Sequence, residues 1–210
     1  MSFMKLKTVA PLLLAAVLSP AFGAVPETRE DAAKAFSRGD YKTALQVLRK
    51  LADKGDMEAA GMIGFIYSQG SESVRDCGQA IAWVRKAADK DEPHAQHNFG
   101  VMYESGICVR QDYTQAIHWY ELAAAKGHIG AISNLGTMLM SGQGVKQDPV
   151  KAVALFRKAA DAGDAIAQSN LGMAYTSGTG VPSDQYGDFL GAFDMLATAK
   201  PRGKLLATRQ

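Results

Sequence analysis

The stretch ISNLGTMLMSGQGVKQDPVKAVALFRKAADAGD at 132–164 decides the fold of this chain of 210 residues. It completes a unit at 129–164, and units of equal length with the same pattern lie at 57–92, 93–128 and 165–200. Small residues, aromatic residues and glycines recur in them at fixed positions. A period of about 36 residues is typical of stacked helical hairpins. We therefore expect an all-α fold, an α-solenoid of stacked antiparallel helix pairs.

The first half of each unit predicts a helix with a glycine in its interior. Apolar and small residues recur there at spacings of four, which keeps them on one helical stripe. A glycine inside a helix costs about 1 kcal/mol relative to alanine, so glycines in phase predict that another backbone approaches closely. These glycines are Gly64, Gly100, Gly136 and Gly172.

The loop inside each unit carries a stop signal and a start signal. Glycines stand where the first helix should end, and we expect them in the left-handed conformation; they are Gly70, Gly106, Gly142 and Gly178. Six residues later an aspartate predicts the N-cap of the second helix; these are Asp76, Asp112, Asp148 and Asp184. The unit 57–92 has SESV where the others have ICV, QGV and TGV, so we expect its loop to run differently.

These features together resemble the Sel-1-like repeat, a relative of the tetratricopeptide repeat with a longer loop. The shared pattern is A-x-x-N-L-G-x-x-Y-x-x-G-x-G-V-x-x-D-x-x-K-A-x-x-x-F/W-x-x-K-A-A, and the stretch at 132–164 matches it best. The resemblance covers roughly 28–187. It implies a solenoid adaptor that holds other proteins together, with no shared catalytic residue and no cofactor.

Both ends of the array depart from the pattern. An N-terminal partial unit at 24–56 shows only the second half, with a shorter connector before it. The unit at 165–200 loses the pattern after its first half, and we expect it to be a divergent C-terminal cap. A basic tail follows at 201–210, which we expect to be a solvated terminus.

The first residues predict export. Lys5 and Lys7 precede an apolar run from Val9 to Leu18 and then SPAFGA, which is the pattern of a signal peptide at 1–23. Cleavage is expected after Gly23, giving a periplasmic or secreted protein. The apolar run is much shorter than the roughly 20 residues that a membrane span requires, so no stable span is expected.

The charge balance argues against nucleic acid as a partner. The chain has 23 Lys and Arg against 21 Asp and Glu. Removing Lys5 and Lys7 with the signal peptide leaves a formally neutral chain, whereas nucleic-acid-binding domains are basic.

Cys77 and Cys108 are the two cysteines of the chain, and an exported protein is expected to pair them. Cys77 should begin the second helix of one unit, and Cys108 should lie in the loop of the next, so stacking would bring them together. The alternative is a reactive thiol at Cys77, because thiolates are favoured at helix N-termini.

The sequence contains no enzyme signature in its mature part. We find no G-x-S-x-G, phosphate loop or H-E-x-x-H motif. His94, His97 and His128 would suit a weak divalent site, but zinc normally takes three or four ligands and no carboxylate or cysteine is fixed beside them. We expect solvated surface histidines and no metal.

An asparagine recurs at one phase of the first helices, as Asn98, Asn134 and Asn170. In a tetratricopeptide-like solenoid these helices line the concave face, where an amide can both donate to and accept from a bound peptide backbone. The alternative is a framework role, bonding to the neighbouring hairpin. His94, Met102 and Met138 share the stripe and complete the expected partner-binding set.

These observations predict an exported adaptor that binds a peptide or protein segment in the concave groove, without chemistry. One alternative is a β-lactam-binding or β-lactam-hydrolysing enzyme, which rests on the analogy with cysteine-rich exported relatives. Those relatives have cysteine pairs in most units, and this chain has one pair. Another alternative is a secreted factor that uses the same groove on a host protein.

Overall fold

The computed structural model describes residues 28–181, which form nine helices and no strand. The helices are α1 (Arg29–Ser37), α2 (Tyr41–Asp53), α3 (Met57–Gln69), α4 (Cys77–Ala88), α5 (Pro93–Ser105), α6 (Tyr113–Ala125), α7 (Ile129–Ser141), α8 (Pro149–Asp161) and α9 (Ala165–Ser177). The predicted signal peptide at 1–23, the cap at Asp184, the second half of the last unit and the tail at 201–210 lie outside the described residues.

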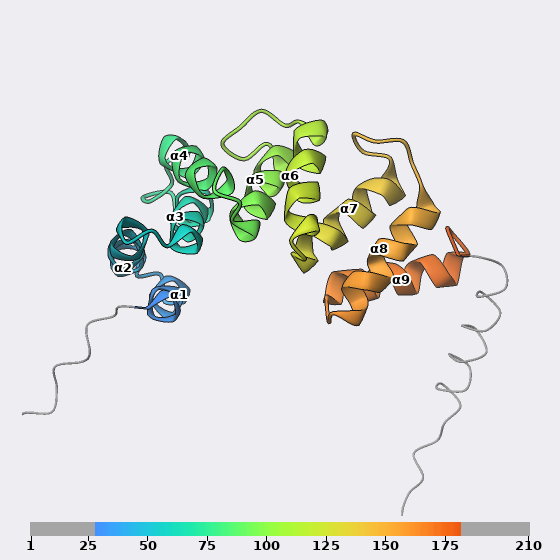
Figure 1. Ribbon diagram of the computed structural model, residues 1–210, viewed down its shortest axis with the longest axis horizontal. Coiled ribbons are helices and arrows are strands. Elements are labelled where there is room, and N and C mark those ends of the chain that lie inside the picture. Colours follow the sequence, from blue (N-terminus) through green and yellow to red (C-terminus); the bar gives the residue numbers. More distant parts are fainter. Residues whose placement is uncertain (1–27, 182–210) are drawn as a thin grey trace, which may run out of the picture.

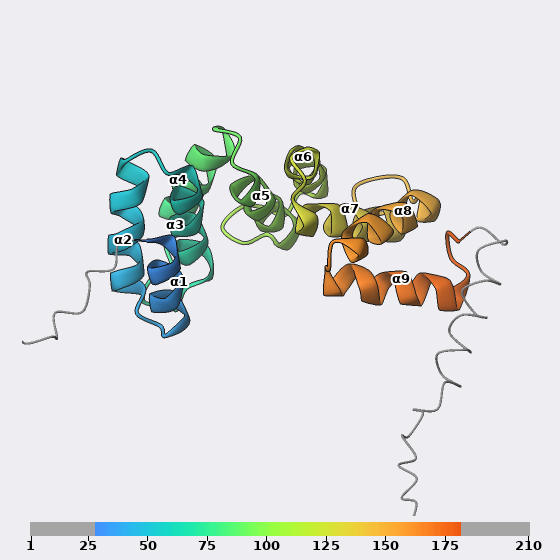
Figure 2. The same ribbon diagram turned by 60° about the horizontal axis from the view of Figure 1, so that its bottom comes forward.

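The helices pack as successive antiparallel pairs, which confirms the predicted solenoid. α3 packs on α4, α5 on α6 and α7 on α8, and each pair packs on the next. Figure 1 shows the pairs following one another along an arch, with α1 and α3 on its inner side and α2 and α4 outside. The turned view in Figure 2 shows α9 crossing the direction of the first helices, so the array twists as it advances.

At three of the interior glycines the paired second helix approaches closely with its backbone, as predicted, and also with a side chain. A Cβ at Gly100 would lie 2.5 Å from Cε1 of Tyr120, and a Cβ at Gly136 would lie 2.7 Å from Cε1 of Phe156. Backbone is close as well: a Cβ would lie 2.8 Å from the Val84 nitrogen at Gly64, 3.2 Å from the Ala116 carbonyl oxygen at Gly100 and 3.3 Å from the Ala152 carbonyl oxygen at Gly136. Gly64, Gly100 and Gly136 therefore each admit a side chain of the paired second helix, whereas a Cβ at Gly172 would meet no described atom within 4 Å.

Most loop signals behave as predicted, and one does not. Asp76, Asp112 and Asp148 each accept a backbone N–H of the following helix. Gly106, Gly142 and Gly178 end their helices in the left-handed conformation, with φ between 67° and 75°.

Gly70 is the exception among these loop glycines, because its φ is −63°. Its loop forms a separate turn, in which Val74 N–H donates to the Ser71 carbonyl. The SESV segment therefore changes how the helix ends, and the prediction of a left-handed cap at Gly70 was wrong.

The first unit is more complete than its sequence pattern indicated. It contains a first helix, α1, whose capping box joins Thr28 and Asp31. Only Arg38, Gly39 and Asp40 separate α1 from α2, so the shorter connector was predicted correctly. Ala32 and Ala35 of α1 are buried against the rest of the array.

None of the helices in 28–181 is long and apolar enough to span a membrane.

Candidate functional site

A cavity of about 420 Å³ opens on the inner face of the array, where first helices of successive units meet. One wall is apolar and comes from α1 and α3, with Phe36, Met62 and Phe65. The rings of Phe36 and Phe65 lie 5.8 Å apart. Phe65 is 40% exposed. An exposed aromatic wall of this kind is unusual for a surface that stays in water, and it marks the cavity as a candidate binding site.

The rest of the named lining of this cavity is polar and comes from α5 and the start of α7. His94, His97, Asn98 and His128 line it. His94 is the most accessible of the three rings, with its side chain 60% exposed. The cavity, which we call the inner groove, therefore combines an apolar half with a half that offers hydrogen-bonding groups. Ligand sites commonly have this composition and volume.

The histidines form a packed cluster, and two of them are partly buried. The rings of His97 and His128 stack with centroids 4.4 Å apart, and His94 meets His128 edge-on at 4.9 Å. Burial lowers the pKa of His97, and it lowers the pKa of His128 to about 4, where the nearby His97 and His94 add to the effect. The prediction of solvated histidines therefore holds for His94 and was wrong for the other two.

Among residues 28–181, no group of three or more His, Cys, Asp or Glu side chains is arranged to hold a metal ion. His97 and His128 stack, and His94 meets His128 edge-on, so the cluster offers packing and hydrogen bonding.

The three repeated asparagines differ in what they contact. Asn98 lines the inner groove. Asn134 has its Nδ2 atom 3.3 Å from Nε2 of His97 in the preceding unit. Asn170 donates to the Thr137 hydroxyl across the next boundary, at 3.4 Å. Asn134 and Asn170 thus have the contacts of the framework alternative, whereas Asn98 lines the groove and its side chain is hydrogen-bonded to His97.

Met102 and Met138 do not belong to the inner surface, which corrects the expected set. Their side chains are 1% and 0% exposed and lie in the core. A step of four residues rotates a helix about 40° beyond a full turn. Met102 and Met138, which come four residues after Asn98 and Asn134, therefore lie beyond the edge of the inner face, on the side of the helix that packs on the second helix.

A polar network behind the groove depends on Gly100. The Tyr120 ring crosses above this glycine, and its hydroxyl donates to Glu104 on the neighbouring helix. Burial and this hydrogen bond raise the pKa of Tyr120, so its hydroxyl stays protonated. Tyr120 also contacts the ring of His97, at 5.7 Å between centroids. The network fixes one face of the histidine cluster.

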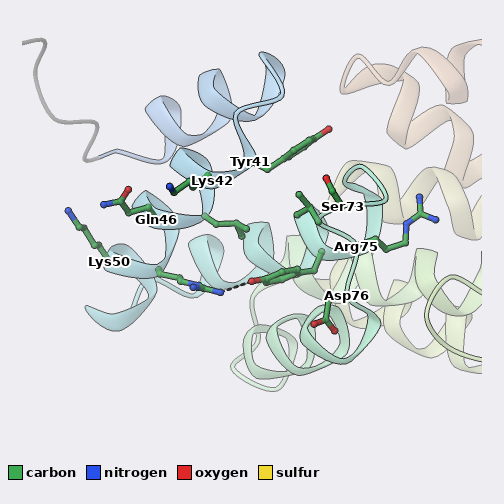
Figure 3. A pocket seen from close by; sticks show the side chains of 11 residues that line it. Tyr41, Lys42, Gln46, Lys50, Ser73, Arg75 and Asp76 are labelled. Atoms are coloured by element: carbon green, nitrogen blue, oxygen red, sulfur yellow. Dashed lines mark hydrogen bonds between the residues drawn. The ribbon is translucent and has the colours of Figure 1, made fainter.

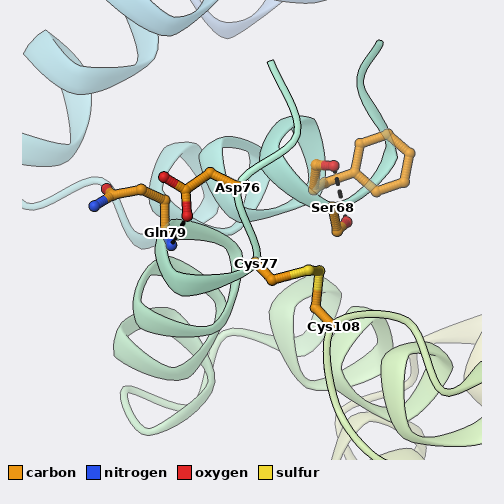
Figure 4. The surroundings of a disulfide bond; sticks show 6 residues. Ser68, Asp76, Cys77, Gln79 and Cys108 are labelled. Carbon is orange, nitrogen blue, oxygen red and sulfur yellow. Dashed lines mark hydrogen bonds between the residues drawn. A yellow bond between two sulfur atoms is a disulfide. The ribbon is translucent and has the colours of Figure 1, made fainter. Parts of the chain in front are cut away.

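The predicted disulfide is present and joins two adjacent units. Figure 4 shows Cys77 at the start of α4 bonded to Cys108 in the loop between α5 and α6. Cys108 has φ 63°, a left-handed value, and the equivalent positions in the next units are Gly144 and Gly180. The bond therefore occupies a place where the repeat otherwise has glycine. It also excludes the free thiol alternative.

A second hollow of about 750 Å³ lies outside the arch, between α2 and the loop before α4 (Figure 3). Lys42, Arg49, Lys50 and Arg75 are among its lining residues. Arg49 donates to the Tyr67 hydroxyl at 2.5 Å. In Figure 3 the side chains of Lys50 and Arg75 point away from each other, so the cationic groups do not converge on one ligand position.

Sequence reasoning missed the apolar wall and the burial of two histidines. Phe65 stands at a position that holds Val101, Thr137 and Met173 in the later units, so its size alone marked it as unusual. His128 occupies the residue just before a first helix, where α3, α5 and α9 have an acidic residue. That departure was visible in the aligned repeats.

Comparison with known proteins supports the assignment of the repeat. The family model described as Sel1 repeat matches residues 58–92, 93–128, 129–164 and 165–186. The Sel1 repeat protein from Oxalobacter formigenes is 32% identical with a TM-score of 0.66, covering 79% of this chain and 69% of its own. A comparison with curated proteins finds no match.

Two further solved structures are similar. A protective antigen present in uropathogenic Escherichia coli strains, which displays an SLR fold, is 41% identical with a TM-score of 0.61. The similarity covers 65% of this chain and 29% of that one, so this chain spans less than a third of the antigen's length. Cysteine rich protein B of Helicobacter pylori is 20% identical with a TM-score of 0.47, and this similarity gives the hydrolase alternative no support.

Proposed function

Because this chain belongs to the Sel1 repeat family, we propose that it is an exported adaptor that binds a segment of a partner protein in the inner groove. Arrays of this family are generally scaffolds for protein–protein interaction. The observation that carries the proposal is the inner groove itself, which is lined by the exposed Phe65 together with Asn98 and His94. The function is recognition, without a chemical step.

The two walls of the groove suggest how a segment binds. An apolar side chain of the partner fits between Phe36, Met62 and Phe65, and its burial supplies most of the affinity. Asn98 can donate to and accept from the partner's backbone at the same time. His94, which is largely exposed, adds a second polar contact. A short extended or helical segment satisfies both walls.

Export is the second part of the proposal. The basic and apolar run before Gly23 supports a cleaved signal peptide. The disulfide between Cys77 and Cys108 supports an oxidising compartment. The Escherichia coli relative is a protective antigen, and by analogy we propose that this chain acts outside the cytoplasm and begins at Ala24. Intact-mass measurement of the protein isolated from its own cells tests this start.

The groove is tested by crosslinking in cells, with tagged protein and mass-spectrometric identification of the partners. Phe65→Ser and Asn98→Ala should each reduce the recovery of a specific partner, Phe65→Ser by roughly tenfold or more, because groove anchors dominate binding energy. Val150→Ser is the matched control: Val150 is 63% exposed and lies on α8, away from the groove.

The groove variants must fold for this comparison, and circular dichroism at 222 nm checks that they do. Recovery that is unchanged in both folded groove variants would place the partner elsewhere on the array. Equal losses in the Val150→Ser control would show that recovery depends on exposed apolar surface in general.

A further inference from the structure

The first helices of the repeated units share one capping position, and α7 alone uses histidine there. Asp56 caps α3, Glu92 caps α5 and Asp164 caps α9, each through a carboxylate that accepts backbone N–H groups. At α7 the Nδ1 atom of His128 accepts the N–H of Ala131 at 3.2 Å. An imidazole accepts through this atom only while the atom is unprotonated.

Protonation of His128 would act on α7 in two ways. The ring would lose the lone pair that accepts the Ala131 N–H. It would also place a positive charge at a helix N-terminus, which carries a partial positive charge of its own. A carboxylate cap has neither problem at neutral or mildly acidic pH. The cap of α7 is therefore the one among these helices that responds to pH in this range.

The ring faces further groups that respond to its charge. His97 and His94 of α5 lie beside it, and a charge on either one opposes protonation of His128. Glu92, the cap of α5, favours protonation but is already bonded to Nδ1 of His94 at 2.9 Å. Glu92 thus compensates only part of the cost of a charged ring.

Other charges near His128 are already paired. On the loop before it, Lys126 pairs with Asp91 at 3.4 Å. Across the groove, Glu58 pairs with Arg29. Behind the cluster, the carboxylate of Glu104 accepts the Tyr120 hydroxyl, as described above.

We propose that protonation of His128 releases the cap of α7, loosens the junction between α5 and α7 and so weakens the inner groove for its partner. The last step rests on the proposed function, and the first two do not. Because His128, His97 and His94 all line the groove, the same protonation would place charge beside its apolar wall. A partner bound at neutral pH is then released as the pH falls.

The direction follows from the two states of the ring. Burial holds the pKa of His128 near 4 in the folded junction, against 6.5 in an opened one. The opened state has the higher pKa and therefore binds the proton first, so opening of the junction becomes more favourable as the pH falls from about 7 to about 4. Below about pH 4 the ring is protonated in both states, and His128 no longer changes the opening equilibrium. For a half-buried ring we expect the equilibrium constant for opening to be roughly tenfold higher at pH 5 than at pH 7.5.

Hydrogen exchange measured by NMR on the full mature chain tests the switch without a partner. Protection factors, which are corrected for the intrinsic pH dependence of exchange, should fall for the amide of Ala131 and stay level for that of Ala167, which Asp164 caps. The variant His128→Asp supplies the carboxylate cap of the other units and should abolish the difference. The variant His94→Gln keeps the His128 cap and should retain the difference in protection between Ala131 and Ala167.

The switch is overturned if Ala131 and Ala167 lose protection together in the wild type, or if His128→Asp keeps the full pH dependence. Partner recovery at pH 7.5 and pH 5.5 then tests the consequence for the groove. Recovery should drop at the lower pH for the wild type and less so for His128→Asp. If no partner is recovered at either pH, the proposed function fails, while the exchange result still decides the switch.

Discussion

At the scale of single residues, Gly100 has a defined steric role. The side chain of Tyr120 fills the space beside it, is fully buried and is anchored through its hydroxyl to Glu104. Any β-carbon at position 100 would need this ring to move. The ring cannot move without breaking its hydrogen bond, so the glycine is required despite its low helix propensity.

We predict that Gly100→Ala lowers the free energy of unfolding by about 1–3 kcal/mol, because overpacking outweighs the gain in helix propensity. Urea denaturation followed by circular dichroism measures the change. Gly78→Ala in α4 is the matched control, since Gly78 is exposed and a Cβ there would meet only Oδ1 of Asp76, at 3.3 Å. The free energy of unfolding of this control variant should stay unchanged or rise by up to about 1 kcal/mol. Equal stability of both variants would show that the Tyr120 ring adapts freely.

How far single residues could be predicted depended on how local their roles are. Asp76, Asp112 and Asp148 cap helices through groups two or three positions away, so the sequence was sufficient. Met102 shares a stripe with Asn98 only approximately, and the 40° offset per four residues decided that it is buried. The burial of His128 depends on the ring of His97, which is distant in the sequence, and no local pattern contains that information.

At the scale of elements, the disulfide joins the start of α4 to the loop of the following unit. The sequence separation of 31 residues means that the bond closes a long loop in the unfolded chain. Restricting that loop stabilises the folded state by about 3–4 kcal/mol in the chain-entropy account. The bond therefore contributes a substantial part of the typical stability of a domain of this size.

We predict that reduction, or the double variant Cys77→Ala with Cys108→Gly, lowers the free energy of unfolding by about 3–4 kcal/mol. Cys77→Ala with Cys108→Ala should lose about 1 kcal/mol more, because residue 108 has a left-handed φ that only glycine adopts without cost. Urea denaturation of the two variants, with and without reductant, separates these effects. No difference between them would show that the loop relaxes once the bond is absent.

The elements themselves were largely predictable, and the loops were less so. Helix pairs follow from the period, the caps and the apolar stripes, all of which are properties of one unit. The loop after Gly70 differs because SESV replaces the glycine-containing segment, and a sequence pattern indicates such a difference without giving its geometry. The first helix α1 was missed because it is short and lacks the interior glycine of the later units.

At the scale of the whole molecule, the array is a linear stack in which each unit packs mainly on its neighbours. Stability in such arrays is a sum of unit and interface contributions. The period therefore predicted the architecture. It did not predict the inner groove, because that cavity depends on the curvature of the stack and on the side chains Phe36, Phe65 and His97 from three different units.

We predict that the array opens from its N-terminal end. α1 has only 9 residues and packs mainly on α2, whereas α5 and α6 have units on both sides. Hydrogen exchange should therefore be faster in α1 than in α5 or α6 by roughly a hundredfold or more, as for terminal segments generally. Uniform exchange over all these helices would contradict a linear stack and indicate one cooperative unit.

The bond between Cys77 and Cys108 also has a mechanical consequence. If the chain is pulled from its ends, the residues between the two cysteines cannot add to the extension while the bond is intact. At about 3.4 Å per extended residue, roughly 100 Å of contour length stays hidden under load. Under tension the segment between the two cysteines therefore does not extend while the bond is intact. The redox state of the surroundings thus sets the maximum extension of the chain.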